Sequence, residues 1–321
     1  MYKNLFIKLK NFFKSKNSRN LRESSVYSTP PAVDVSRVRE ALAVLDAEGA
    51  SETPTALDEE RPVFILGVGW RVGSTLLQRI CCTDRSLLIW GEPLGNMGII
   101  NRITEAICII RSKGWPFQEY WLSKDRIMDL NKAFLYTEFI ANLYPAAKNF
   151  RLSLQQWVYH WLGQPALDLG FTRWGLKETR LAACDALLLN WLFPKAAFLP
   201  IIRHPVNSYR SCKDAGGQNW VEPRTNNPIS FSKHWNRLAM SWLNVDDSFP
   251  FIMIKYEELI SGKFNFTKIK EITNLDVRPE LALSVKAGST TAATNSVSDK
   301  ESRILYRSTR EGMKVYNYSI N

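Results

Sequence analysis

A short apolar run followed at once by a glycine-rich turn and a helical stretch constrains the fold of this chain most. Val63 to Leu66 is uninterrupted and apolar, as buried parallel strands are. The turn Gly67-Val-Gly-Trp-Arg-Val-Gly-Ser-Thr75 comes next, and Leu76 to Cys82 has a helical pattern. A glycine-rich turn running into a helix N-terminus directs several backbone N–H groups at one point. The sequence therefore predicts an anion-binding loop on an α/β scaffold.

Further segments of the chain extend this pattern. Leu87 to Trp90, Phe198 to Ile202 and Phe251 to Lys255 have strand character, whereas Phe231 to Val245 and most of residues 96–165 are helical by period. Alternating strands and helices predict an α/β fold: a mainly parallel central sheet flanked by helices, as in a P-loop-like three-layer sandwich. Residues 96–165 are then a helical insertion that forms much of a second binding pocket.

The insertion is rich in tryptophan. A tryptophan stripe at helical spacing is more often core than a binding surface, so we expect these side chains to be buried. They are Trp115, Trp121, Trp157 and Trp161.

The charge of the chain is concentrated at its start. The 321 residues carry a net charge of +11, but residues 1–22 hold seven basic side chains and no acidic one, leaving +4 for the other 299. This distribution describes a tail and argues against a nucleic-acid partner. Leu5, Leu9, Phe12 and Phe13 would share one face of a helix, which favours peripheral membrane contact. A solvated or docked tail is the alternative.

The chain is expected to divide into three parts. Residues 1–22 are the basic amphipathic tail. Residues 23–61 hold a short helix, Val33 to Ala47, and a linker, Ala50 to Arg61, rich in Thr, Pro, Asp and Glu. Residues 62–321 are the folded domain. No apolar stretch approaches the length of about 18–20 residues that a membrane-spanning helix needs.

Cysteine and histidine spacing gives no metal site. The five cysteines include no Cys-x-x-Cys pair, and the three histidines are far apart in sequence. We therefore expect no bound metal, and reduced, buried thiols in a cytoplasmic protein. The cysteines are Cys81, Cys82, Cys108, Cys184 and Cys212.

A second candidate anion site follows the apolar run that ends at Ile202. The segment reads Arg203-His-Pro-Val-Asn-Ser-Tyr-Arg-Ser211. Because open α/β sheets bind ligands at the carboxyl ends of their strands, Arg203 is well placed for a ligand. If Pro205 opens a helix, Arg203 and Ser211 can flank a phosphate. The first loop is not a Walker A sequence, since Ser74 stands where its lysine would be, and no acidic strand end is available for magnesium.

Four segments together resemble the sulfotransferases that use 3′-phosphoadenosine 5′-phosphosulfate (PAPS), of the bacterial carbohydrate and protein-tyrosine types. Arg71-Val-Gly-Ser-Thr-Leu76 is similar to that family's 5′-phosphosulfate loop. Arg203-His-Pro with Ser211 eight positions on is similar to its 3′-phosphate element. Trp174-Gly-Leu-Lys-Glu178 resembles its lysine segment, and Ile254-Lys-Tyr-Glu-Glu-Leu259 its late strand. Val72, His204 and Trp70 depart from the usual residues.

The resemblance implies a site and a reaction. PAPS is the implied donor, and the implied acceptor is a hydroxyl on a carbohydrate or glycolipid, with tyrosine next. The resemblance places Gly69, Arg71, Gly73, Ser74, Thr75, Leu76, Arg203 and Ser211 at the donor.

The catalytic roles fall to three side chains. Arg71 and Lys177 hold the leaving phosphate. Glu92, in a Gly91-Glu-Pro93 loop similar to that of the protein-tyrosine and some bacterial carbohydrate sulfotransferases, is the candidate that takes the proton of the acceptor. A nearby anionic donor should raise the pKa of Glu92.

Several alternatives stay open at this stage. Glu178 is the rival base, and Lys177 can instead pair with Glu257 or Glu258. The chain can also be a P-loop kinase or nucleoside-triphosphate hydrolase, a non-catalytic glycan- or nucleotide-binding protein, or the inert body of a membrane scaffold.

Overall fold

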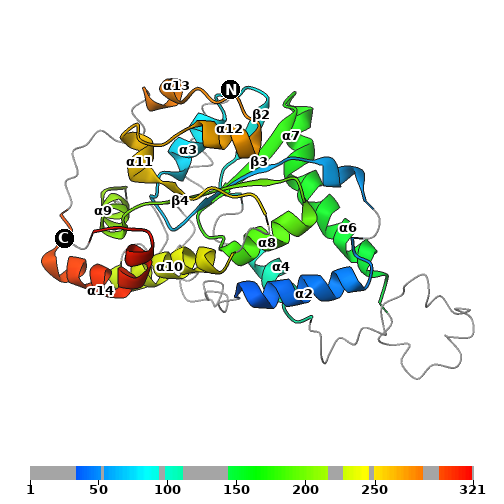
Figure 1. Cartoon of the computed structure of the whole chain (residues 1–321), viewed down its shortest axis with the longest axis horizontal. Helices are drawn as coiled ribbons and strands as arrows, with labels where there is room; N and C mark the ends of the chain where they lie inside the picture. Colours follow the sequence, from blue (N-terminus) through cyan, green and yellow to red (C-terminus); the bar gives the residue numbers. More distant parts are fainter. Residues whose placement is uncertain are drawn as a thin grey trace, which may run out of the picture. The chain divides into compact units, whose positions relative to one another are not determined.

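The central sheet has five strands, all parallel, in the order β2-β3-β1-β4-β5 (Figure 1). The predicted parallel α/β sheet is confirmed. The strands are β1 (Val63–Gly67), β2 (Leu87–Trp90), β3 (Arg173–Glu178), β4 (Ala197–Ile202) and β5 (Ile254–Lys255). This computed structural model describes residues 34–51, 54–93, 98–110, 144–215, 227–245, 249–284 and 296–319, which belong to one compact unit, Val33–Asn321.

Strand β1 lies at the centre of the sheet, and every one of its residues is buried. Val63 is in register with Gly175 of β3 and with Ala197 of β4. The three central strands therefore end at the same edge of the sheet. That edge carries both anion-binding motifs predicted from the sequence, because each follows the carboxyl end of a strand.

Helices cover both faces of the sheet and form the outer layers (Figure 1). The larger apolar core contains side chains of α2 (Val35–Ala47), α4 (Ile99–Ile107), α6 (Ala147–Val158), η7 (Tyr159–Gly163), α7 (Gln164–Asp168), α8 (Ala183–Leu192), α9 (Pro205–Ala215), α10 (Pro228–Ser241), η9 (Trp242–Asn244) and α14 (Asp299–Val315). The smaller core lies against α3 (Ser74–Cys81), α11 (Tyr256–Ile260), α12 (Thr267–Thr273) and α13 (Pro279–Leu283).

The sheet residues divide between these two cores by alternation. Phe64 and Leu66 lie in the larger core, whereas Val63 and Ile65 lie in the smaller one. Because both faces are covered, the strands are apolar without a break, which is why β1, β2 and β4 could be predicted from sequence.

The described part of the insertion is helical, as predicted, and comprises α4, α6, η7 and α7; residues 111–143 lie outside the described residues. The last strand is shorter than expected. Regular pairing covers Ile254 and Lys255, and Phe251 contributes a single bridge to Phe198.

The residues before β1 bear out one prediction and correct another. The predicted helix before the domain is present as α2, and its apolar face belongs to the larger core. The predicted linker holds a 3₁₀ helix, η2 (Ala56–Glu59), that is tied to the body. Asp58 accepts a hydrogen bond from the buried Arg151 of α6 at 2.5 Å and another from Gln155 at 2.9 Å. This segment is therefore packed against the domain and is not a free linker.

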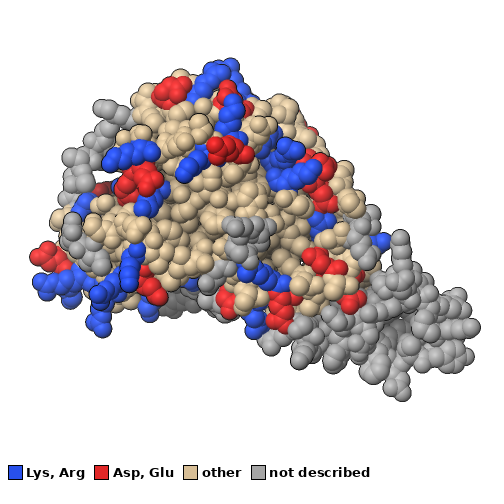
Figure 2. Space-filling model, viewed as in Figure 1, with Lys and Arg blue, Asp and Glu red and all other residues tan. Residues whose placement is uncertain are grey.

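Four of the five cysteines are buried, Cys82 is half-buried, and none forms a disulfide. Burial raises the pKa of Cys108 to about 11 and that of Cys212 to about 12, so both thiols stay protonated at neutral pH. Across the described ranges, no helix combines the length and apolar character required for a membrane crossing. Basic and acidic side chains are intermixed on the face seen in Figure 2.

Candidate functional site

The loop between β1 and α3 has an unusual backbone. Gly69, Arg71 and Gly73 all have positive φ, at +97°, +60° and +93°. Residues that alternate between left- and right-handed conformations turn successive N–H groups toward one side and form an anion-binding nest. Gly73 is also the N-cap of α3, whose first N–H groups have no partner within the helix. The predicted anion cradle is thus present in the backbone.

The other loop residues divide between solvent and core. Arg71 and Thr75 are exposed, Ser74 is buried, and Leu76 packs against the smaller core. Arg71 and Thr75 therefore present polar groups to solvent, whereas Leu76 secures the first turn of α3.

Tyr256, the first residue of α11, packs directly on this loop. A Cβ at Gly73 would lie 2.1 Å from the Tyr256 ring, so no larger residue fits there. The guanidinium of Arg203 lies over the same ring, 4.4 Å from its centroid. The ring therefore joins the first loop to the second motif. Sequence reasoning quoted Tyr256 within a motif but assigned it no role.

The two predicted anion-binding motifs meet at the same sheet edge. Arg71 donates from Nε to Ser211 Oγ at 3.2 Å, and Arg203 donates from Nη1 to the Arg71 carbonyl at 3.1 Å. Helix α9 begins at Pro205, as predicted. The structure thus brings the two motifs into direct contact at this edge.

Arg203 is half-buried at the end of β4. Burial lowers its pKa, and nearby Tyr256 and Glu257 oppose that effect. Its Nε is buried and has no hydrogen-bond partner among the described residues. A buried guanidinium N–H without a partner is costly, and an anion would satisfy it.

The neighbouring backbone is fixed by Glu257. Its Oε1 accepts from the backbone N–H of His204 at 2.9 Å, and its Oε2 accepts from the Tyr318 hydroxyl at 3.1 Å. Glu257 is therefore occupied at the second motif, and Lys177 does not pair with it.

Lys177 pairs instead with Glu92, which follows the end of β2. Its Nζ donates to Glu92 Oε1 at 2.6 Å, and Arg180 Nη1 donates to Glu92 Oε2 at 3.0 Å. The same Arg180 Nη1 donates to Glu178 Oε1 at 2.7 Å. Two carboxylates and two cations thus form one network. Sequence reasoning did not identify Arg180, although it lies three residues after Lys177.

The environments of the two carboxylates push their pKa values apart. Burial raises the pKa of Glu92, but the charges and hydrogen bonds of Lys177 and Arg180 outweigh it and hold that pKa below its ordinary value. Burial raises the pKa of Glu178, with Arg180 opposing and Glu92 adding to the increase. Such divergence is typical of carboxylates with different roles in proton transfer. The sequence predicted that a bound anion raises the pKa of Glu92. Its neighbours Lys177 and Arg180 have the opposite effect and lower that pKa.

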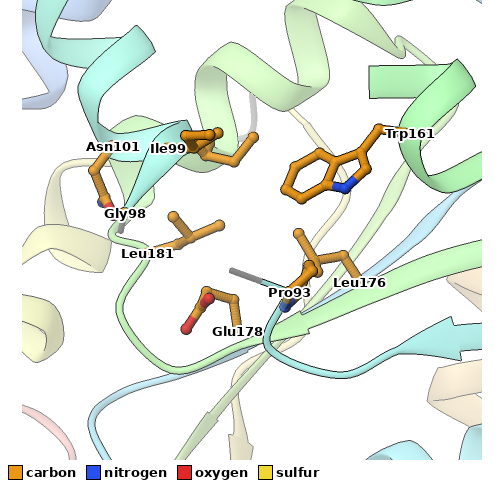
Figure 3. A pocket seen from close by; sticks show the side chains of 9 residues that line it. Pro93, Gly98, Ile99, Asn101, Trp161, Leu176, Glu178 and Leu181 are labelled. Atoms are coloured by element: carbon orange, nitrogen blue, oxygen red, sulfur yellow. The ribbon is translucent and has the colours of Figure 1, made fainter. Parts of the chain in front are cut away.

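A small, partly open pocket lies beside this network (Figure 3). Glu178 and Pro93, the residue after Glu92, lie on one side of it, and Trp161 lies across from Glu178 (Figure 3). Trp161 packs against the larger core, as expected, and also lines this pocket, whereas Trp157 is 37% exposed. The pocket is lined by Pro93, Gly98, Ile99, Ile100, Asn101, Trp161, Leu176, Glu178 and Leu181.

No group of three or more His, Cys, Asp or Glu side chains within the described ranges has the arrangement of a metal site. Trp70 stacks on His234 with ring centroids 4.0 Å apart beneath the first loop. His204 Nε2 lies 3.3 Å from the Ser319 carbonyl. His234 therefore contacts an aromatic ring, and His204 contacts a backbone carbonyl, which favours a structural role for both histidines.

Comparison with solved structures finds similarity to sulfotransferases. Solved structures with similarity include the sulfotransferase domain from the curacin biosynthetic pathway, at 16% identity and a TM-score of 0.44, covering 82% of this chain and 99% of that one. Another is the sulfotransferase domain of the Synechococcus PCC 7002 olefin synthase, at 15% identity and a TM-score of 0.42, covering 82% and 97%. Sulfotransferase STF9 from Mycobacterium avium has 14% identity and a TM-score of 0.43, covering 94% and 93%.

The family assignment rests on the sequence. No curated protein matches the chain. A model of the sulfotransferase family matches residues 62–268, which is more than half of the chain and includes the first loop, the Lys177 segment and the second motif. The chain belongs to the sulfotransferase family.

Proposed function

We propose that this sulfotransferase-family enzyme transfers the sulfuryl group of PAPS to an acceptor hydroxyl. The observation that carries the proposal is the junction of the two anion-binding motifs, in which Arg71 contacts Ser211 and Arg203 contacts the Arg71 carbonyl. A nucleotide with phosphate groups at two positions needs two such clusters of donors on one sheet edge.

The residues present fit such a donor. The positive φ values of the loop turn its backbone N–H groups toward one side, and the absence of a Cβ at Gly73 lets the Tyr256 ring pack against the start of α3. The unpartnered Nε of Arg203 supplies a further donor at the second motif. Gly69, Arg71, Gly73, Ser74 and Thr75 would hold the 5′ end, and Arg203 and Ser211 the 3′-phosphate. When bound, PAPS supplies the group that is transferred and a phosphate as leaving group.

Charge accounts for the catalytic roles. Arg71, Lys177 and the loop N–H groups stabilise the negative charge that grows on the leaving phosphate. Glu92 accepts the proton of the acceptor hydroxyl. For this, Lys177 must be drawn from Glu92 toward the phosphate, which raises the pKa of the carboxylate as the proton is taken. Glu178 is the alternative base, since it lines the pocket and has the higher pKa.

Fewer residues identify the acceptor than identify the donor. The motif resemblance favours a hydroxyl on a carbohydrate or glycolipid, with tyrosine second. The buried, unbridged cysteines support a reducing, cytoplasmic location.

Calorimetric titration with adenosine 3′,5′-bisphosphate tests the donor half. We expect binding in the absence of metal, and a loss of at least tenfold in affinity for Arg203→Met, which removes charge-assisted hydrogen bonds. Mass spectrometry of acceptors incubated with PAPS then detects sulfuryl transfer. Tight binding of ATP–Mg²⁺ with no binding of the bisphosphate would refute the proposal in favour of a kinase or hydrolase.

We also propose that residues 1–22, which lie outside the described residues, make peripheral contact with anionic membranes. Seven basic and no acidic side chains support this. Flotation with phosphatidylserine-containing vesicles should recover the full chain and not a variant lacking residues 1–22. Equal recovery with neutral vesicles would contradict an electrostatic contact.

A further inference from the structure

The peptide unit that follows Arg203 is held at both of its polar atoms. The Trp235 indole N–H donates to the Arg203 carbonyl at 3.1 Å, and the His204 N–H of the same unit donates to Glu257 Oε1 at 2.9 Å. Because the carbonyl and the N–H of a trans peptide point in opposite directions, Trp235 of α10 and Glu257 of α11 hold the unit from two sides. These two partners restrict the backbone from which the Arg203 side chain projects.

Both partners are supported by the end of α14, which lies beside α10 (Figure 1). Gly312 of α14 packs directly on Trp235, since a Cβ at Gly312 would lie 2.9 Å from the tryptophan ring. Tyr318, three residues after the helix ends, donates its hydroxyl to Glu257 Oε2 at 3.1 Å. One short stretch of chain therefore contacts both groups that hold the Arg203 peptide unit.

The turn that ends α14 directs Tyr318 back toward the second motif. The Tyr318 N–H donates to the Met313 carbonyl at 2.8 Å, and the Asn317 N–H donates to the Lys314 carbonyl at 3.2 Å, which is the Schellman pattern. Asn317 has the left-handed conformation that this turn requires, at φ +52°, and asparagine adopts it more readily than most residues. The position of Tyr318 is thus set by the local sequence at the end of the helix.

His204 adds a second contact to the same segment. Its Nε2 lies 3.3 Å from the Ser319 carbonyl, and its ring meets the Tyr318 ring edge to face, with centroids 5.5 Å apart. Burial lowers the pKa of His204, so the ring is neutral at pH 7 and adds no charge beside Glu257. The family model matches residues 62–268, so these contacts join the matched region to a segment outside it.

We propose that Tyr318 is a positioning residue for the 3′-phosphate half of the donor site, and that it acts through Glu257. Its hydroxyl holds the Glu257 carboxylate against the His204 N–H, and this contact, with Trp235 on the other side, keeps Arg203 in position for the phosphate. A carboxylate released from these contacts would also repel an anionic ligand nearby. The inference rests on the proposed function, which assigns Arg203 to the 3′-phosphate.

Two nucleotides separate the 3′-phosphate from the rest of the donor. Adenosine 3′,5′-bisphosphate carries that phosphate, and adenosine 5′-monophosphate lacks it. Each is titrated by calorimetry into the full chain and its variants. Tyr318→Phe keeps the ring and removes the hydroxyl, so it should weaken bisphosphate binding about fivefold and leave monophosphate binding unchanged. A variant that only destabilised the fold would not distinguish the two nucleotides.

Tyr316→Phe is the matched control. Tyr316 lies on the same turn but donates its hydroxyl to the Ala239 carbonyl of α10, at 2.9 Å. This variant also removes one hydroxyl hydrogen bond from the segment, and the bond between Tyr318 and Glu257 is kept. It should retain wild-type affinity for both nucleotides.

Variants of Glu257 test whether Tyr318 acts through it. Glu257→Ala removes the acceptor of the His204 N–H and should weaken bisphosphate binding about tenfold, whereas Glu257→Gln keeps an oxygen for that N–H and should retain most of the affinity. The double variant of Tyr318→Phe and Glu257→Ala should bind the bisphosphate no more weakly than Glu257→Ala alone, because the hydroxyl then has no carboxylate to hold.

Hydrogen exchange followed by mass spectrometry gives a readout that needs no nucleotide. In Tyr318→Phe the amides of residues 203–211 should exchange faster than in the wild type, because the Glu257 contact that orders them is weakened. The amides of β3 should exchange at the wild-type rate. Tyr316→Phe should leave the exchange of residues 203–211 unchanged.

The outcomes that overturn the inference differ from those that overturn the proposed function. Wild-type bisphosphate affinity in Tyr318→Phe, an equal loss for the monophosphate, or an equal loss in Tyr316→Phe refutes the positioning role. Additive losses in the double variant refute the route through Glu257. Failure of the wild-type chain to bind the bisphosphate refutes the proposed function, while unchanged exchange of residues 203–211 in Tyr318→Phe still refutes the ordering of the second motif by Tyr318.

Discussion

At the scale of single residues, Arg71 shows how the site balances strain and binding. A non-glycine residue at φ +60° costs about 1 kcal/mol relative to ordinary backbone. Arg71 is held there by two contacts from the second motif, through its carbonyl and through its guanidinium. The conformation therefore depends on residues more than 130 positions away, and the loop and the second motif order each other.

Gly73→Ala should abolish tight binding of the bisphosphate. The new Cβ would collide with the Tyr256 ring, in addition to the strain of a positive φ. We expect at least a tenfold loss of affinity by calorimetry. Gly170→Ala is the matched control, since Gly170 also has a positive φ, at +89°, but has open space around it. That variant should lose about 1 kcal/mol of stability and keep its affinity. Equal losses of affinity in Gly73→Ala and Gly170→Ala would indicate that backbone strain, and not the collision with Tyr256, weakens binding.

The identity of the base can be read from the pH profile of kcat/KM for the donor, which reports the free enzyme, in which Lys177 still pairs with Glu92. Both carboxyls have an ordinary pKa of 4.5; that of Glu92 is lowered and that of Glu178 raised. A group with a lowered pKa stays ionised until the pH falls below its ordinary value. With Glu92 as base, the acid limb of kcat/KM therefore lies below pH 4.5, and with Glu178 as base it lies above.

Matched amide variants complete this test. Glu92→Gln should lower kcat at least a hundredfold, the usual contribution of a general base, with the donor KM changed far less. Glu178→Gln should lower kcat by less than tenfold. The reverse order of the two effects would transfer the role of base to Glu178.

At the scale of elements, the 3₁₀ helix η2 shows how a segment before the sheet is bound to it. Arg151 is 3% exposed, and its charge is matched by Asp58, a residue of η2. Arg151 also donates from Nε to the Trp191 carbonyl at the end of α8. The ion pair thus links η2, α6 and α8. A buried pair of this type matters chiefly because the loss of one partner leaves the other uncompensated.

Asp58→Asn should destabilise the protein by about 3 kcal/mol at pH 7, measured by urea unfolding. Burial raises the pKa of Asp58, but Arg151, the Thr55 N–H and Gln155 hold it below its ordinary 3.8. A lowered pKa means that this stabilisation is complete above pH 3.8 and is lost as the pH falls through the lower, folded value. The gap between wild type and variant should therefore narrow below pH 3.8. A double variant with Arg151→Met should recover part of the loss, and no recovery would contradict the ion-pair explanation.

At the scale of the whole molecule, the question is where the folded domain begins. The compact unit spans Val33–Asn321, whereas the sequence predicted a start at residue 62. Helix α2 buries one apolar face in the larger core. Its buried side chains are Val35, Val38, Ala41, Leu42, Val44 and Leu45.

Two truncated variants test this boundary. Removal of residues 1–33 should leave the urea midpoint and the affinity for the bisphosphate unchanged. Removal of residues 1–61 also deletes α2 and η2 and exposes their partners, which should lower stability by about 5 kcal/mol or more, or cause aggregation. An unchanged midpoint for the longer deletion would instead support a domain that begins at residue 62.

The local sequence pattern was enough to predict much of the fold. Strands β1, β2 and β4 are continuous apolar runs because helices cover both faces of the sheet, so their positions were readable. Strand β3 was less evident, since Arg173, Lys177 and Glu178 interrupt its apolar character. The π-helical turn at Tyr159–Gly163 was not predicted either, because its stabilising contacts come from β2 and β3.

The sequence by itself determined the glycine-rich loop, the arginine at the end of β4 and the family to which they belong, because glycine conformation and strand ends follow from local residue type. Only the tertiary structure decided that Lys177 pairs with Glu92, that Arg180 links two carboxylates, and that Trp161 faces Glu178. The contacts of Lys177 and Arg180 with Glu92 depend on the pairing of β2 with β3, which places side chains 85 or more residues apart at one sheet edge. Strand order is set by the packing of the whole core, and no local pattern encodes it.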